Sequence, residues 1–116
     1  MLSFHGGLKI FLAIEPCDMR RGFNGLFALA QNQLNEDPLD GGLFIFSNKK
    51  RNRIKVIYFD GIGLWVLAKR LENGKFSWPL STGHDQTKFR LALEALQLLM
   101  DGVDLKQATM RAWYER

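Results

Sequence analysis

Cysteine and histidine are scarce in this 116-residue chain, which holds one cysteine and two histidines. A single thiol, Cys17, cannot build a disulfide framework, so the composition favours a reducing compartment. His5 and His84 stand far apart in the sequence and share no spacing at which histidines hold a metal ion. We therefore expect no disulfide, no metal site and no cofactor.

Long apolar runs are also missing. The run Ile10 to Ile14 is too short for a membrane span or a signal peptide, and the chain lacks a basic start. We therefore expect a cytoplasmic protein. The hydrophobic share of 47% is typical of a globular chain and too high for a disordered one. For this length we expect a single domain over residues 1–116.

Apolar periodicity predicts a strand and then a helix in the first 35 residues. Residues 8–14 are apolar and β-branched enough for a strand. Asp18 stands where an N-cap is expected, and Gly22 and Gly25 weaken the following helix by about 1 kcal/mol each relative to alanine. One apolar face recurs at helical spacing in that helix: Met19, Phe23, Leu26, Phe27, Ala30 and Leu34.

The middle of the chain has the pattern of a β-meander. A turn is predicted at Asp40-Gly41-Gly42, and hairpin signals stand at Asp60-Gly61 and Asn73-Gly74. The predicted strands are residues 43–47, 54–59, 64–70 and 76–78. Pro79 ends the last one, because proline has no backbone donor.

Two helices are predicted to close the chain. A capping box at Thr82–Asp85 begins the first and Gly102 ends it, whereas Asp104 with Gln107 opens a short terminal segment. The apolar face of the first consists of Phe89, Leu93, Leu96 and Met100. The predicted order, β-α-β-β-β-β-α-α, describes an α+β fold: a small, mostly antiparallel sheet with helices packed on one face or end.

Positive charge is concentrated between Ser47 and Lys55, at the tip and start of a predicted hairpin. The charged residues there are Lys49, Lys50, Arg51, Arg53 and Lys55. Charges this close repel one another, and a polyanion would relieve the repulsion and release counterions. A two-stranded ribbon also fits the major groove of DNA. The alternative is a solvated basic turn that keeps the sheet edge from aggregating. We favour nucleic-acid contact because the charges are clustered.

Further basic residues are candidates to extend this surface. Lys69 and Arg70 end the next strand, and Arg20 and Arg21 stand at a predicted helix N-terminus, which attracts phosphate. A cap at Asp18 would already occupy the free amides, so we treat the two arginines near it as secondary candidates. The sheet aromatics are expected in the core, at Trp65 and Trp78 above all, although Tyr58 is also a candidate to stack on bases.

Catalysis has little support in the sequence, which has no phosphate-binding loop, nucleophile elbow or dinucleotide fingerprint. Cys17 has no neighbour that predicts a lowered pKa, so a structural thiol is expected. Asp18, Asp40 and Asp60 stand beside caps or turns, where aspartate is common for backbone reasons. A metal-dependent nuclease using Asp18 and Asp60 is therefore the least favoured interpretation.

Several short motifs agree in order and spacing with one known family. They are Asp18 to Arg21, Gly25-Leu26, Leu43 to Phe46, Lys50 to Lys55, Tyr58 to Gly63, Lys69 to Glu72 with Gly74, Phe76 and Trp78-Pro79, and Gly102 to Asp104. In these motifs the chain resembles the TnpB accessory protein of bacterial transposons of the insertion-sequence-sixty-six type, the product of the second open reading frame. It departs from many relatives at Gly22, where they carry serine, and at Asn24, where they carry aspartate.

The resemblance implies a non-catalytic accessory protein of DNA transposition, encoded beside a separate and larger transposase. It supplies no catalytic residues, so the candidate DNA-binding residues rest on charge and placement alone. We expect DNA as the partner, with a transposon end as the natural target. The alternative is a protein-interaction module that docks on the transposase through the aromatic sheet face or the C-terminal helices.

Overall fold

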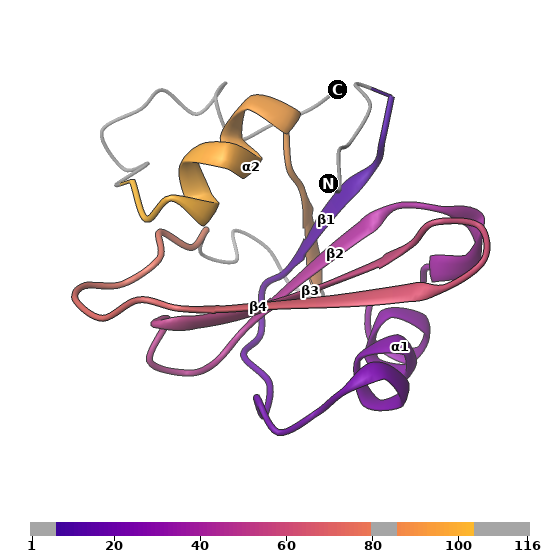
Figure 1. Cartoon of the computed structure of the whole chain (residues 1–116), viewed down its shortest axis with the longest axis horizontal. Helices are drawn as coiled ribbons and strands as arrows, with labels where there is room; N and C mark the ends of the chain where they lie inside the picture. The colour runs from indigo at the N-terminus through magenta and orange to yellow at the C-terminus, as the bar shows by residue number, and fades with distance from the viewer. Residues whose placement is uncertain (1–6, 80–85, 104–116) are drawn as a thin grey trace.

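The computed structural model describes residues 7–79 and 86–103, which form one five-stranded sheet and two α-helices (Figure 1). The strands lie in the order β4-β3-β2-β1-β5, and every neighbouring pair is antiparallel except β1 with β2. Their bounds are Ile10–Ala13 (β1), Leu43–Ser47 (β2), Arg53–Phe59 (β3), Leu64–Arg70 (β4) and Lys88–Arg90 (β5). The helices are Phe23–Asn32 (α1) and Leu93–Met100 (α2), and a short 3-10 helix, Pro38–Asp40, precedes β2. The predicted α+β fold with a mostly antiparallel sheet is confirmed.

Both faces of the sheet carry a helix, because successive side chains of a strand point to opposite faces. On one face α1 packs over Phe11, Phe44 and Ile57. On the other face α2 packs over residues such as Ile10 and Ile45. Figure 1 shows the two helices on opposite sides of the sheet. The prediction that the helices share one face or end was therefore wrong.

Two neighbouring inner strands, β1 and β2, are buried along their whole length. Such continuous apolar strands are typical of sheet positions covered on both faces, and parallel neighbours need a crossover connection. Helix α1 lies in that connection. Next to the crossover, the rings of Phe11 and Phe44 stack with their centroids 5.5 Å apart on the α1 face.

The first helix begins later than predicted. Its N-cap is Gly22, since the carboxylate of Asp18 instead accepts hydrogen bonds from the backbone and guanidinium of Arg20. Phe23 then starts the helix with a side chain that is 55% exposed, so it does not belong to the buried face. The fully buried residues of that face are Leu26, Ala30 and Leu34.

The fifth strand is not the one that the meander pattern predicted. Residues 76–78 form no strand, because the backbone N–H of Phe76 donates to the carbonyl of Arg51 in the β2–β3 turn. Residues 88–90, predicted as helix, instead pair with the free edge of β1. There Phe89 and Leu91 are buried at a spacing of two, which is the period of a strand.

The second helix is shorter than predicted, and it begins at Leu93. Gly102, at a φ of 77°, follows its end as expected. The predicted capping box at residues 82–85 and the predicted segment from Asp104 lie outside the described residues. Within residues 7–79 and 86–103, neither helix is long and apolar enough to cross a membrane.

The stacked pair in the α1-side core gives a prediction for stability. Phe44 is fully buried, so Phe44→Ala should lower the free energy of unfolding by about 3–5 kcal/mol. Phe23→Ala removes the same atoms from an exposed position and should change it by less than about 1 kcal/mol. Urea unfolding followed by circular dichroism measures both. Equal losses would contradict the placement of the two rings.

Candidate nucleic-acid interface

The turn between β2 and β3 is held by the side chain of Asn48. Its carbonyl oxygen accepts from the backbone N–H groups of Asn52 and Arg53, at 3.1 Å each, and its amide donates to the side chain of Asn52 at 2.6 Å. The backbone N–H of Asn48 also donates to the carbonyl of Arg53. These bonds give the basic turn a defined shape and leave Lys49 and Lys50 exposed at its tip.

Arg51 points away from the tip and into the protein. Its guanidinium donates to the backbone carbonyl of Ile14 at 3.0 Å and lies 5.0 Å from the centre of the Trp78 ring. The indole N–H of Trp78 donates in turn to the carbonyl of Ala13, so both side chains bind the end of β1. Burial lowers the pKa of Arg51, and the charge of Glu15 opposes that shift. These contacts give Arg51 a role in the fold that its place in the basic run did not predict.

Arg53 and Arg70 lie directly opposite each other on β3 and β4. Like charges in such a cross-strand pair are destabilising. Glu72 partly neutralises Arg70 through a 3.1 Å ion pair, in which both side chains are more than half exposed. Within residues 7–79 and 86–103, Arg53 has no such carboxylate partner. We call Lys49, Lys50, Arg53 and Arg70 the basic patch.

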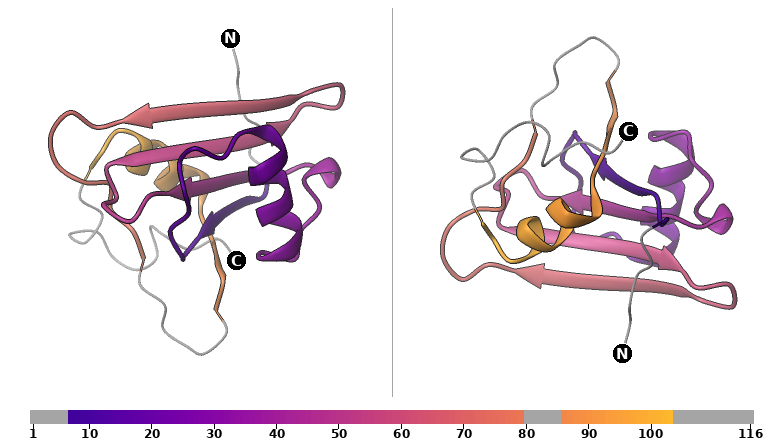
Figure 2. Two further views of the ribbon diagram at one scale, coloured as in Figure 1. Left: turned by 90° about the horizontal axis from the view of Figure 1, so that it is seen from below. Right: turned by 90° about the horizontal axis from the view of Figure 1, so that it is seen from above.

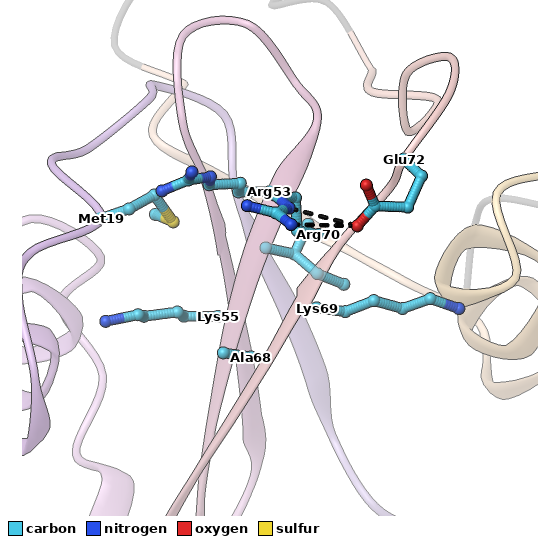
Figure 3. Close-up of a pocket in the computed structure, with 8 residues that line it drawn as sticks. Met19, Arg53, Lys55, Ala68, Lys69, Arg70 and Glu72 are labelled. Atoms are coloured by element: carbon cyan, nitrogen blue, oxygen red, sulfur yellow. Dashed lines mark hydrogen bonds and ion pairs between the residues drawn. The ribbon is translucent and has the colours of Figure 1, made fainter.

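Lys55 and Lys69 leave the sheet in opposite directions, as Figure 3 shows. The amine of Lys55 donates to the carbonyl of Arg21 at 2.8 Å, on the α1 side. The amine of Lys69 donates to the carbonyl of Met100 at 2.7 Å, at the C-terminal end of α2. A positive charge there also interacts favourably with the helix dipole. Both lysines therefore link the sheet to its covering segments and lie beside the basic patch rather than in it.

A shallow hollow of about 400 Å³ lies where β3 begins and β4 ends (Figure 3). Its lining carries four positive side chains and one negative one. The residues are Met19, Arg53, Ile54, Lys55, Ala68, Lys69, Arg70 and Glu72. Because side chains alternate along a strand, Arg53 and Lys55 lie on the same face of β3 as Ile57, which belongs to the α1-side core.

The two arginines before α1 differ in their contacts. Arg20 forms a 2.7 Å ion pair with Asp18, and both side chains are exposed. Arg21 is exposed, and its backbone carbonyl is the acceptor for Lys55. That bond places the segment before α1 next to β3, where Met19 of the same segment lines the hollow.

The aromatic residues of the sheet follow the expectation only in part. Trp78 is buried as predicted, whereas Trp65 is 45% exposed, so its assignment to the core was wrong. Its indole N–H donates to the carboxylate of Asp60 at 2.9 Å, at the surface of the protein. Tyr58 packs against the α2-side core.

The residues considered for catalysis stand apart from one another. Asp60 binds the backbone N–H groups of Ile62 and Gly63 at the far end of β3, whereas Asp18 lies near the β2–β3 turn. In the described ranges no three His, Cys, Asp or Glu side chains gather in a way that would hold a metal ion. Burial raises the pKa of the Cys17 thiol, which disfavours a reactive thiolate. His5 and His84 lie outside those ranges.

Comparison with known proteins places this chain in a family. The family model described as IS66 Orf2 like protein matches residues 8–110. The chain belongs to this IS66 Orf2-like family. The uncharacterized protein y4jC of Sinorhizobium fredii is 40% identical over 105 residues, which cover 90% of this chain and 86% of that protein. A second protein of that bacterium, y4hO, is 36% identical over 106 residues, covering 90% and 88%.

Membership of the IS66 Orf2-like family makes the chain a transposition-associated accessory protein. The match confirms the resemblance that the short motifs indicated, and it includes the whole basic patch. No solved structure matches the chain.

The half-buried side chain of Arg51 gives a second prediction. Lysine keeps the charge but loses the planar guanidinium that lies 5.0 Å from the centre of the Trp78 ring, and with it the fixed geometry of the bond to Ile14. Arg51→Lys should therefore lower the free energy of unfolding by about 1–3 kcal/mol. Arg53→Lys, the same change at an exposed position, should stay within about 0.5 kcal/mol. Urea unfolding measures the free energy of unfolding of both variants. An Arg51→Lys variant as stable as the unmodified protein would show that the contact is not stabilising.

The Asp18–Arg20 pair gives a third prediction. Hydrogen bonds from Arg20 lower the pKa of the Asp18 carboxyl from 3.8 to about 2. Stabilisation from this pair is therefore present above pH 3.8 and lost as the pH falls through about 2. In Arg20→Ala the pKa should rise toward 3.8, as followed by NMR titration of the carboxyl carbon. Arg21→Ala, which removes only a weaker attraction, should leave it close to 2.

Proposed function

We propose that this IS66 Orf2-like protein binds DNA through the basic patch, as an accessory protein with no catalytic role of its own. The observation that carries the proposal is the cross-strand pair of Arg53 and Arg70. Two arginines opposite each other cost stability, and Arg53 has no carboxylate partner in the described part of the chain. A phosphate group between or beside them would remove the repulsion and form charge-assisted hydrogen bonds.

The shape of the surface supports the same proposal. Lys49 and Lys50 extend the positive charge to the tip of the β2–β3 turn. The side chain of Asn48 fixes the backbone of that turn through its hydrogen bonds. A rigid donor set loses less entropy on binding than a mobile one. The hollow beside Arg53 is shallow and open, which suits a polymer backbone better than a small molecule enclosed on all sides.

The contacts also refine which cations take part. Arg51, Lys55 and Lys69 already donate to backbone carbonyls of the protein, so releasing them to a phosphate would cost those bonds. Lys49, Lys50 and Arg53 have no such commitment among the described residues, and Arg70 has only an exposed ion pair. We assign the direct phosphate contacts to these four, with Arg20 and Arg21 secondary.

The test is binding of the purified protein to a labelled transposon-end duplex and to a scrambled duplex, titrated over salt concentration. Affinity should fall with salt, and Arg53→Gln should flatten the slope of log K against log salt by about 1. The control is Lys9→Gln, which also removes one exposed positive charge. Lys9 precedes β1, whereas the basic turn contacts Ile14 after β1, so this variant should leave the slope unchanged.

Each result has a distinct meaning. Tighter binding to the transposon end than to the scrambled duplex would add sequence recognition to phosphate contact. Equal binding to both would restrict the role of the patch to the phosphate backbone. An equal slope for Arg53→Gln and the unmodified protein, or no binding at low salt, would overturn the proposal and make docking on the transposase the leading function.

A further inference from the structure

Strand β4 forms a free edge of the sheet. It pairs with β3 over seven consecutive residues and has no neighbour on its other side within residues 7–79 and 86–103. Figure 2 shows β4 as the outermost strand in both views. The strand contains no proline, glycine or bulge, and the charged residues that also discourage edge pairing, Lys69 and Arg70, stand together at its end. Among the described residues, nothing occupies its free backbone groups.

Two hydrogen bonds show which backbone groups of β4 are free. The backbone N–H of Asp60 donates to the carbonyl of Gly63 before the strand, and the backbone N–H of Leu71 donates to the carbonyl of Asn52 after it. Since hydrogen-bonded positions in an antiparallel pair alternate, the odd-numbered residues of β4 bond to β3. The N–H and C=O groups that point outward are those of Leu64, Val66, Ala68 and Arg70.

We propose that β4 pairs antiparallel with β4 of a second copy of this chain, which joins the two sheets into one. The two-fold axis passes beside Leu67, which lies opposite Leu67 of the second copy. In this register Val66 lies opposite Ala68 of the second copy, and Leu64 lies opposite Arg70 of the second copy. Every outward N–H then meets an outward carbonyl, which gives eight hydrogen bonds by symmetry.

The side chains of β4 are complementary to themselves in this register. Trp65, 45% exposed in one copy, lies opposite Lys69 of the second copy, so the aliphatic stem of that lysine packs on the indole ring while its amine keeps its bond to the carbonyl of Met100. Together with the paired Leu67 side chains, the two indoles form an apolar centre on the α2 side. Like charges stay apart, because the Lys69 residues are roughly 14 Å and the Arg70 residues roughly 20 Å from their own copies along the strands. A parallel pairing would place like charges side by side.

This pairing has a consequence for the basic patch, although it does not depend on DNA binding. A two-fold axis between antiparallel strands is perpendicular to the sheet, so the α1 faces of both copies lie on the same side. The Arg53–Arg70 pairs of the two copies then lie on one surface. One strand pair buries less area than a standard interface, so we expect dissociation in about the micromolar range.

The first experiment is sedimentation velocity of the full chain over a concentration series. The unmodified protein should pass from monomer to dimer. Ala68→Pro removes an outward N–H without removing a bond to β3, and should raise the dimer dissociation constant about tenfold or more. Ala68→Val keeps the N–H and should dimerise like the unmodified protein. A monomer at every concentration, or equal dimerisation of both variants, would overturn the proposal.

A crosslinking experiment tests the register independently and does not require that the proline variant fold. In a Cys17→Ala background, Leu67→Cys places two thiols across the two-fold axis, whereas Lys69→Cys places them roughly 14 Å apart. With oxidised glutathione, the first variant should form a disulfide-linked dimer and the second should remain a monomer. Equal crosslinking of both, or none in either, would overturn the register.

Discussion

Burial of β1 and β2 on both faces is the constraint on which the rest of the structure depends. Their apolar side chains alternate between two faces, so each face needs its own cover. Helix α1 covers one face, and α2 covers the other together with Phe76 and Trp78. The α1 cover extends over the start of β4, at Leu64 and Val66, but the far half of that strand carries Arg70 and stays exposed. The charged residues therefore gather where the apolar cover ends.

The sequence predicted best those elements whose signals are local. The strands β2, β3 and β4 follow from alternation and turn residues, and their predicted bounds agree with the structure to within one residue. The start of α1 was predicted too early because the carboxylate of Asp18 binds Arg20, two residues away, and does not cap the helix. The preference of aspartate for N-cap positions does not distinguish these two arrangements. Strand β5 was missed because Phe89 fits both a helical spacing to Leu93 and a strand spacing to Leu91. Only the free edge of β1 decides between them.

The candidate site was likewise predicted only in part. The clustering of positive charge identified the segment, but it did not distinguish one cation in it from another. The structure separates those that donate to the protein itself, such as Lys55 and Lys69, from those at the surface, such as Lys50 and Arg53. That separation depends on contacts between residues more than 30 positions apart, which no local pattern contains. It also explains how one basic run stabilises the fold while leaving charge exposed.

The left-handed backbone of Arg51 sets how this turn tolerates change. Its φ of 60° suits glycine or asparagine better than other residues, yet neither of these reaches the carbonyl of Ile14 or the ring of Trp78. A substitution that relaxes the backbone therefore removes the contacts of the turn with Ile14 and Trp78, and one that keeps these contacts retains the strain. Lys49 and Lys50 are exposed and have no left-handed backbone, so neither requirement applies to them. The turn thus combines a fixed anchor with two variable positions, so related proteins can exchange surface charge at the tip without altering the frame that presents it.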